Sequence, residues 1–239
     1  MKKILKKLLN ELGFEIKRLS PSTSISTRLK YLFSHHKVDL VLDVGANVGA
    51  YVSFLRDFGY VGKVVSFEPL STCYSILEDL SQKDPLWEVA PRAAIGNEDG
   101  EIVINISANS YSSSALNMLD SHLSSAPASV YVGSETVPLK RLDDCAKQYL
   151  ADDFRSVYLK IDVQGFEVQV LDGAQHILPR INGIQLELSL IPLYEGQILF
   201  RDMLDKMDDL GYELYAILPG FTDKVTGRLL QVDGVFFRK

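Results

Sequence analysis

Three short polar runs in the sequence have residue types suited to chemistry, and each follows a stretch of apolar residues. The first is Asp43-Val44-Gly45-Ala46-Asn47-Val48-Gly49, a carboxylate followed by a glycine-rich turn. Gly45 permits a tight turn with close approach of a ligand, and Gly49 opens the next predicted helix. Asn47 stands where a dinucleotide fingerprint has its second glycine, which disfavours NAD or FAD. A P-loop lysine and hydroxyl are also missing from this run, which disfavours a nucleoside triphosphate.

The second run is Phe67-Glu68-Pro69, with Glu68 placed 25 residues after Asp43. A carboxylate at a strand end can accept hydrogen bonds from both hydroxyls of a ribose. Glu68 alone could equally be an exposed acid beside a turn-forming proline. Combined with the glycine turn, it favours a ribose-bearing ligand that lacks a pyrophosphate, and S-adenosylmethionine (SAM) meets that description.

The third run is Lys160-Ile161-Asp162-Val163-Gln164-Gly165-Phe166-Glu167. Lys160 and Asp162 share one side of a predicted strand, because strand side chains alternate at period two. The predicted strand 184–190 places Gln185, Glu187 and Ser189 on one side in the same way. If the two strands are neighbours, four of these residues form one polar cluster: Lys160, Asp162, Gln185 and Glu187. This cluster is either the floor of an active site or a structural ion pair between Lys160 and Glu187.

Alternating strands and helices must position these runs. We predict strands at 38–44, 61–67, 87–89, 137–142, 157–163, 184–190, 212–218 and 229–237. We predict helices at 49–58, 71–82, 143–150, 166–178 and 199–210, and a hairpin of 93–95 with 101–106 around Asn97–Gly100. Such βα repeats indicate a mainly parallel sheet with helices on both faces and ligands bound at the carboxyl ends of its strands.

Two segments depart from this alternation. Residues 107–134 are rich in Ser, Asn and Ala, and a segment of this length is either functional or disordered; we assign it as a variable cap over the acceptor. Residues 1–37 are predicted as an N-terminal helical extension of a domain at 38–239. The stripe of Leu5, Leu8, Leu9 and Leu12 indicates an amphipathic helix over 1–13. That helix either caps the domain or rests peripherally on an anionic membrane.

The composition fits one large globular domain with enough residues to bury a core. The chain has 239 residues, of which 25 are Lys or Arg and 31 are Asp or Glu, for a net charge of −6. Residues 1–18 hold six bases and two acids, a net of +4, so the rest of the chain carries −10. This acidic body disfavours nucleic acid as a partner. The sequence shows no 18-residue apolar run, and Lys6 and Lys7 interrupt what would be the apolar core of a signal peptide. Cys73 and Cys145 lack the spacing of a zinc site. Together these features predict a cytoplasmic protein.

The polar runs, in their order along the chain, resemble the FkbM family of SAM-dependent methyltransferases over about residues 38–239. The run from Lys160 to Glu167 is the most specific element of the resemblance. Leu142-Asp143-Asp144 and the terminal Asp233-Gly234-Val235-Phe236-Phe237 complete it. The resemblance implies the class I SAM-methyltransferase (Rossmann-like) fold: a seven-stranded, mainly parallel sheet with an antiparallel last strand and helices on both faces. It also implies SAM as cofactor and methylation of a hydroxyl on a sugar, a glycan or a natural product.

The resemblance also implies roles for individual residues. Gly45, Asn47 and Gly49 would hold the methionine end of SAM, and Asp43 would face its amino group. Glu68, with the adjacent Pro69, would hold the ribose. Ala93 and Ala94 would lie near the adenine, and Asp162 beside the methyl group.

Methyl transfer to a hydroxyl needs alignment of the acceptor oxygen and removal of its proton. Asp162 is the first candidate for the base, with Lys160 and Glu187 as the other catalytic candidates, although a nearby Lys160 would weaken Asp162 as a base. His122 and His176 are alternative bases. A second scheme places Mg²⁺ on Asp162 and Glu187, but we assign no metal site. The rival functions are a catalytically degenerate SAM-binding scaffold and, less favoured, a nucleic-acid methyltransferase.

Overall fold

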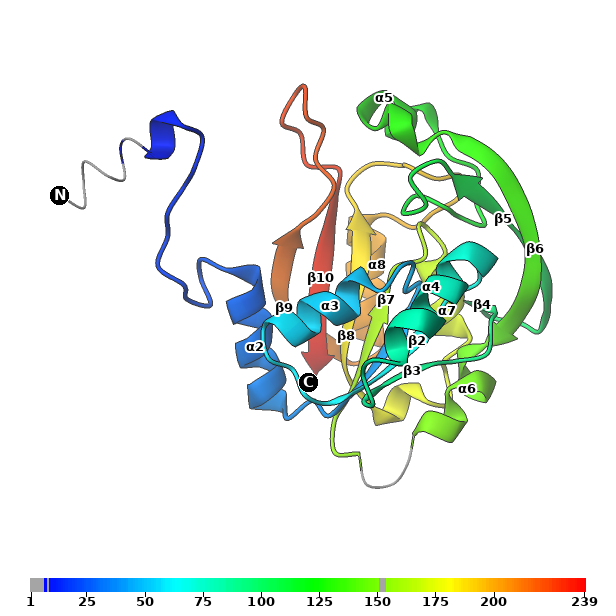
Figure 1. The fold of residues 1–239 in the computed structure, drawn as a ribbon. Helices are drawn as coiled ribbons and strands as arrows, with labels where there is room; N and C mark the ends of the chain where they lie inside the picture. The colour runs from blue at the N-terminus through cyan, green and yellow to red at the C-terminus, as the bar shows by residue number, and fades with distance from the viewer. Residues whose placement is uncertain (1–6, 8, 151–153) are drawn as a thin grey trace.

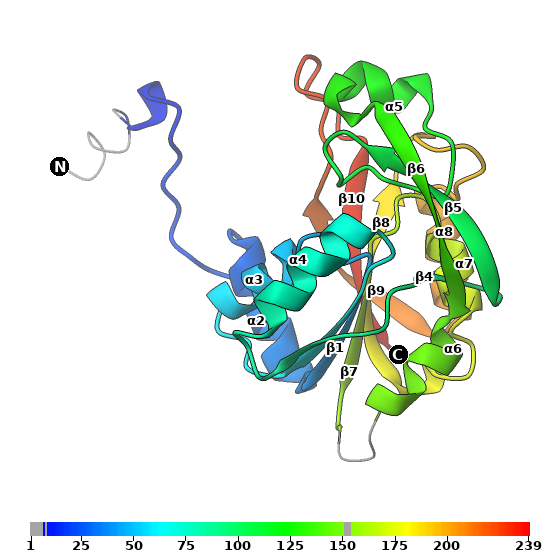
Figure 2. The ribbon, with the colours of Figure 1, turned by 45° about the vertical axis from the view of Figure 1, so that its right-hand side comes forward.

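A sheet of seven strands lies at the centre of the protein, with helices on both of its faces (Figures 1 and 2). The structure is a computed structural model that describes residue 7, residues 9–150 and residues 154–239. Helices α2, α3 and α4 cover one face of the sheet, and α6, α7 and α8 cover the other (Figure 2). The predicted α/β architecture is therefore confirmed.

The strand order of the central sheet is β3-β2-β1-β7-β8-β10-β9. All neighbouring pairs from β3 to β8 are parallel, whereas β10 runs antiparallel to both β8 and β9. The predicted antiparallel last strand is thus confirmed. The strands are β1 (Leu40–Val44), β2 (Lys63–Phe67), β3 (Trp87–Val89), β7 (Val157–Ile161), β8 (Ile181–Ser189), β9 (Tyr212–Pro219) and β10 (Gln231–Arg238).

The described helices are shorter than predicted on one face of the sheet. They are α2 (Ile25–His36), α3 (Ala50–Asp57), α4 (Ser71–Ser81), α5 (Asp120–Ser125), α6 (Leu142–Cys145), α7 (Glu167–Asp172) and α8 (Phe200–Asp209). The predicted helices 143–150 and 166–178 are wrong in extent, because each breaks into a short helix followed by a single 3₁₀ turn, Lys147–Tyr149 and Leu178–Arg180. A distant carboxylate holds the chain between the two parts of the second helix: Asp143 accepts the backbone N–H groups of His176 and Ile177.

A hydrophobic core lies on each face of the sheet. All five residues of β1 are buried, as expected for a central strand covered on both faces. On the α2 side, Leu29 and Phe33 are buried with Val41 and Tyr158. Residues 25–36, which we predicted as part of an N-terminal extension, therefore pack into the same core as the sheet.

A second, three-stranded sheet lies beside the first and has the order β4-β6-β5. Its strands are β4 (Ala94–Gly96), β5 (Gly100–Ser107) and β6 (Tyr131–Arg141). The predicted hairpin is wrong, because β4 pairs parallel and β5 antiparallel with β6 between them. The turn crosses the end of β6, where Asp99 accepts hydrogen bonds from the side chain of Lys140 and the backbone N–H of Arg141.

The segment 107–134 is ordered and includes α5 and the start of β6. Ser107 Oγ donates to the carbonyl of Ser129 over 2.9 Å, and Asn109 Nδ2 donates to Ser129 Oγ over the same distance. The segment lies above the ends of the central strands (Figure 1).

The predicted helix 1–13 falls mostly outside the described residues. From residue 14 to 19 the chain has no helix or strand, and it runs away from the body (Figure 2). Within the described residues, no helix has both the length and the apolar character needed to cross a membrane.

Candidate functional site

A cavity opens at the carboxyl ends of β1, β2 and β7, where the three polar runs meet. It holds about 710 Å³ of space, part of it continuous with solvent. Its lining includes seven residues predicted to hold a cofactor: Gly45, Asn47, Glu68, Pro69, Ala93, Ala94 and Asp162.

The turn after β1 needs glycine at position 45. Gly45 has φ +81°, and a Cβ added there would lie 1.9 Å from the carbonyl oxygen of Asp162. Asn47 also adopts a left-handed conformation, with φ 48°. Its backbone N–H donates to Glu68 Oε2 over 2.8 Å, so the turn is tied to the end of β2.

Glu68 is buried at the base of the first cavity, with 3% of its surface exposed. Burial raises its pKa to about 7, although hydrogen bonds from the backbone N–H groups of Leu70 and Asn47 oppose the shift. A carboxylate offers about four acceptor positions, and these two bonds occupy two of them. Glu68 can therefore still accept hydrogen bonds from hydroxyls of a ligand.

Gly49 is not among the described residues that line the cavity. It precedes α3 with φ +81°, and a Cβ there would lie 2.6 Å from the Trp87 ring. The structure therefore gives Gly49 a packing role, between the start of α3 and the indole of Trp87.

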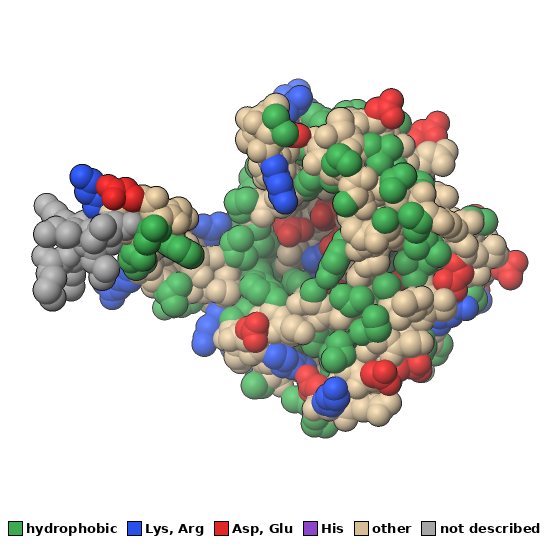
Figure 3. Space-filling view, turned by 45° about the horizontal axis from the view of Figure 1, so that its top comes forward, with side chains coloured by type: hydrophobic (Ala, Val, Ile, Leu, Met, Phe, Trp, Pro, Cys, Tyr) green, Lys and Arg blue, Asp and Glu red, His purple; other side chains and the backbone are tan. Residues whose placement is uncertain are grey.

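A second cavity adjoins the first and shares four lining residues with it: Gly45, Asn47, Tyr111 and Asp162. Its other polar lining residues include Asp43, Lys160, Gln185 and Asp233. Seen from this end, the molecule has a hollow with acidic and basic side chains on its floor (Figure 3). A ligand longer than one cavity could extend across the shared residues.

Sheet register aligns the polar residues of this second cavity. Asp43, Lys160 and Gln185 occupy paired positions on β1, β7 and β8, so the predicted neighbouring of the two polar strands is confirmed. Burial raises the pKa of Asp43 to about 7, with Lys160 opposing the shift and Asp162 adding to it. Gln185 Oε1 accepts hydrogen bonds from the hydroxyls of Tyr51 and Tyr158.

Lys160 is 5% exposed and pairs with Asp162, at 3.0 Å between Nζ and Oδ2. An ion pair of Lys160 with Glu187 is the structural alternative predicted from sequence. That prediction is wrong, because the partner of Lys160 is Asp162. Burial lowers the pKa of Lys160, but the surrounding carboxylates, Asp162 foremost, outweigh burial and raise it. The ammonium group stays charged and offsets part of the negative charge of the cluster.

Two residues without an assigned role in the sequence prediction bind the cluster together. Gln164 Nε2 donates to Asp162 and to Glu187, and the Tyr194 hydroxyl donates to Gln164 Oε1. Gln164 could have been noticed, because it lies inside the run from Lys160 to Glu167. Tyr194 carries no such signal, since it reaches the site from a loop 30 residues further on.

Neither alternative histidine base is among the described residues that line the cavities. His122 is 3% exposed and packs against Tyr194 and Phe221, and burial lowers its pKa to about 4. His176 comes before the first residue of β8, so it lies at the amino ends of the parallel strands, opposite the cavity at their carboxyl ends. The structure therefore does not bring either histidine to the predicted site.

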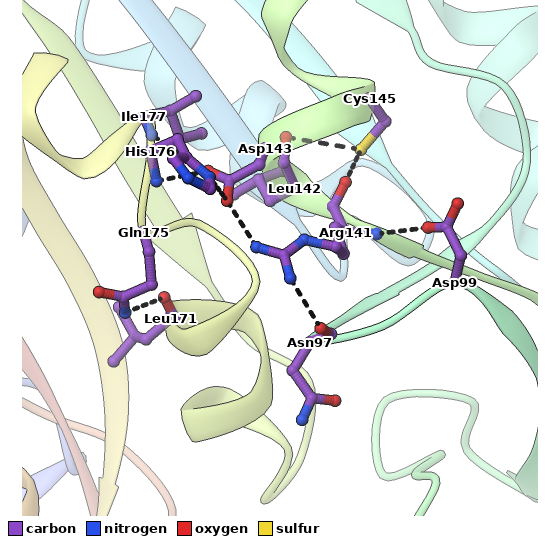
Figure 4. Close-up of polar contacts among 10 residues, drawn as sticks. All are labelled: Asn97, Asp99, Arg141, Leu142, Asp143, Cys145, Leu171, Gln175, His176 and Ile177. Atoms are coloured by element: carbon purple, nitrogen blue, oxygen red, sulfur yellow. Dashed lines mark hydrogen bonds and ion pairs between the residues drawn. The ribbon is translucent and has the colours of Figure 1, made fainter.

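His176 instead belongs to a cluster around Asp143 (Figure 4). Its Nδ1 lies 2.8 Å from Asp143 Oδ2, and Arg141 contacts the same oxygen at 2.9 Å. Asp143 is buried, and its other oxygen accepts two backbone N–H groups. This part of the family-like sequence therefore holds the segment before β8 in place.

Across the described ranges, no three His, Cys, Asp or Glu side chains are grouped as metal ligands. The carboxylates considered for Mg²⁺ have other partners: Asp162 contacts Lys160 and Gln164, and Glu187 accepts from Gln164 and Gln231.

Comparisons with known proteins identify the family to which the chain belongs. The sequence model of the methyltransferase FkbM domain matches residues 43–214. The 2-O-methyltransferase NoeI of Sinorhizobium fredii (strain NBRC 101917 / NGR234) is 27% identical over 210 residues, covering 83% of each chain. Methyltransferase sdnD of Sordaria araneosa is 27% identical over 172 residues, covering 60% of this chain and 66% of that protein.

A crystal structure of Methyltransferase FkbM from Methylobacillus flagellatus KT superposes with a TM-score of 0.50 at 14% identity. It covers 84% of this chain and 43% of that one, and at this identity the likeness shows the fold alone. The family match spans well over half of the chain and includes all three polar runs. The chain therefore belongs to the FkbM family of methyltransferases.

Proposed function

We propose that the protein is a SAM-dependent O-methyltransferase acting on a hydroxyl of a sugar, a glycan or a natural product. The observation that carries the proposal is the cavity that joins the glycine turn, Glu68 and Asp162 at adjacent strand ends. Family membership supports methyl transfer, and the cavity supports the identity of the cofactor.

The residues present fit SAM. Glu68 offers unoccupied acceptor positions to a ribose, and Gly45 lines the same cavity without a side chain of its own. Ala93, Ala94 and Ile95 give part of the first cavity an apolar lining suited to an adenine ring. Asp43 and Asp162 would face a cofactor that is positively charged at its amino group and its sulfur.

SAM, when bound, supplies a methyl group on a positively charged sulfur, and the rest of the chemistry falls to the protein. The residues around Asp162 would orient the acceptor and receive its proton, because an unassisted hydroxyl is a poor nucleophile. The acidic character of the cluster suits a neutral acceptor better than an anionic one, since like charges repel in a partly buried site.

The acceptor class rests on a relative and on charge. The name of the NoeI relative specifies 2-O-methylation, which supports a hydroxyl acceptor for this chain at 27% identity. Outside residues 1–18 the chain carries a net charge of −10, which disfavours nucleic acid as the acceptor.

Transfer of tritium from methyl-labelled SAM to a panel of free monosaccharides and oligosaccharides tests the proposal. We expect incorporation into at least one neutral sugar and none into a DNA or RNA duplex. SAM binding without transfer to any tested acceptor, including natural-product alcohols, would instead support the degenerate scaffold.

A further inference from the structure

The side chain of Gln164 lies between the two carboxylates of the cluster. Its Nε2 donates to Asp162 Oδ1 over 2.7 Å and to Glu187 Oε2 over 2.8 Å. The Tyr194 hydroxyl lies 2.8 Å from Gln164 Oε1. One amide therefore connects the end of β7, the carboxyl-terminal part of β8 and the loop that carries Tyr194.

The partners of the amide settle its orientation. The Asp162 carboxylate, paired with the Lys160 ammonium, only accepts hydrogen bonds, so the NH₂ group must face it. The same NH₂ group then donates to Glu187 Oε2, which stays an acceptor even when Oε1 carries a proton. Gln164 Oε1 then faces Tyr194, whose hydroxyl has to donate. Tyr194 is 1% exposed, and burial raises its pKa, so its hydroxyl remains protonated and can fill this role.

The backbone at Gln164 is held as firmly as its side chain. Gln164 has φ 56°, a left-handed conformation that is uncommon for a residue other than glycine. Ser114 Oγ of the cap segment donates to its carbonyl over 2.6 Å. Glu167 Oε1 accepts the N–H groups of Val163 and Gly165, which flank Gln164.

This arrangement leaves the two carboxylates in different situations. Both oxygens of Asp162 are engaged, Oδ1 by Gln164 and Oδ2 by the Lys160 ammonium. Glu187 uses only Oε2, which accepts from Gln164 and Gln231. Its Oε1 accepts no hydrogen bond from any residue that the structure describes, and the side chain is only partly buried. Glu187 is not itself among the described residues that line the two cavities, but it is bonded to Gln164, which lines the first cavity, and unlike the two histidines it belongs to the cluster around Asp162.

The surroundings of Glu187 also favour proton uptake. Burial is the largest cause that raises its pKa well above the ordinary value, and the carboxylates of Asp162, Asp233 and Glu167 add to the shift. Lys160 on β7 opposes it. The protonated Tyr194 hydroxyl is a further titratable group close to it. A carboxylate with a raised pKa is a stronger proton acceptor near neutral pH.

We propose that Glu187 takes the proton of the acceptor hydroxyl at its free Oε1. Gln164 and Tyr194 are the positioning residues, which hold the Glu187 carboxylate through Oε2 and leave Oε1 open to the acceptor. Asp162 is then the partner of Lys160. The O–H bond of the acceptor breaks and its proton passes to Glu187. The electron pair left on oxygen bonds the methyl group, whose former bonding pair stays with sulfur. This assignment rests on the proposed function.

The first test needs neither cofactor nor acceptor. In protein labelled with ¹³C at glutamate carboxyls, Glu187 is identified as the resonance lost in E187Q and is titrated by NMR. We expect a midpoint above the ordinary glutamate value of about 4.3. Q164A should raise it further, because a donor to the ionised form is lost, and D162N should lower it, because a like charge is removed.

Gln175→Ala is the matched control, because among the described residues Gln175 Nε2 donates to the Leu171 carbonyl alone, within the same segment. It should leave the Glu187 midpoint unchanged. A Glu187 midpoint at the ordinary value, or one that does not respond to Q164A, would overturn the assignment.

The second test uses labelled SAM with whichever sugar of the panel accepts methyl. In E187Q we expect kcat to fall about 10²- to 10⁴-fold and its dependence on pH to disappear, with the Kd for SAM unchanged. D162N should retain the pH dependence, and Y194F should lower kcat more than it changes KM. A pH dependence that survives in E187Q or vanishes in D162N contradicts the assignment. A wild-type protein that neither binds SAM nor transfers methyl would refute the proposed function, while the NMR titration would still test the arrangement.

Discussion

The backbone N–H of Asn47 donates to the buried carboxylate of Glu68, and this bond joins the turn after β1 to the end of β2. The two residues are 21 positions apart in sequence and line the same cavity. A ligand that contacts Glu68 therefore also contacts the turn, so changes in either should affect both stability and binding.

Gly45→Ala should destabilise the protein by about 2–4 kcal/mol, because the new Cβ would overlap the Asp162 carbonyl and the φ of +81° disfavours a side chain. Urea unfolding followed by circular dichroism measures the change. Gly133→Ala is the control, since a Cβ there meets no heavy atom within 4 Å. Equal stability of the two variants would contradict the tight fit at Gly45.

The stability of the ligand-free protein should fall as pH rises from about 5 to about 8. Glu68 has its folded-state pKa raised to about 7, so the folded protein keeps a proton that the unfolded chain has lost. That contribution is complete below the unfolded pKa and disappears as pH rises through the folded one. Asp43 and Glu167 have pKa values raised to about 7 and act in the same direction.

Glu68→Gln isolates the share of Glu68 in this dependence. We expect it to reduce the loss of unfolding free energy over this pH range by roughly 1–3 kcal/mol. Urea unfolding at several pH values measures it, with the exposed Glu101→Gln as control. An E68Q variant with the same pH dependence as the wild type would show that Glu68 has no raised pKa.

Asp143→Ala should lower the free energy of unfolding by about 1–3 kcal/mol, because two backbone N–H groups and the Arg141 guanidinium lose their acceptor. The affinity for SAM should not change, since the contacts around Asp143 lie at the amino ends of the parallel strands and the cavity lies at their carboxyl ends. Asp144→Ala, at the exposed neighbouring position, is the control. Loss of SAM binding in the Asp143 variant alone would show that this region contributes to the site.

Removal of divalent cations by EDTA should leave methyl transfer undiminished. Lys160 and Gln164 already occupy both oxygens of Asp162, which leaves a cation without that ligand. The assay is tritium incorporation with and without EDTA. Activity that disappears with EDTA and returns with Mg²⁺ would support the magnesium scheme instead.

Strand-end residues were predictable because they depend on local pattern. Period-two alternation and the rule that ligands bind at strand carboxyl ends place Glu68 and Asp162 at one edge of the sheet from sequence alone. The pairing of Lys160 with Gln185 across β7 and β8 followed once those strands were neighbours.

Contacts between distant segments were not predictable from local pattern. Asp143 accepts the backbone N–H of His176 from 33 residues away, and no periodicity in the sequence signals that contact. The hairpin prediction failed because β6, more than 30 residues downstream of β4, takes the position between β4 and β5. The family-like motif predicts Gly49 as a ligand contact, and nothing local in the sequence signals that the space beside it is filled by the Trp87 ring of β3.

Titration of the protein with SAM in a calorimeter tests the central claim most directly. We predict binding of one SAM per chain, weakened about 10- to 100-fold in Glu68→Ala through loss of charged hydrogen bonds to the ribose, and unchanged in the exposed Glu101→Ala. Glu68→Gln, which preserves the shape of the side chain, should give an intermediate loss if the fold is intact by circular dichroism. Absence of SAM binding in the wild-type protein, or equal affinity of the Glu68→Ala variant, would contradict the account.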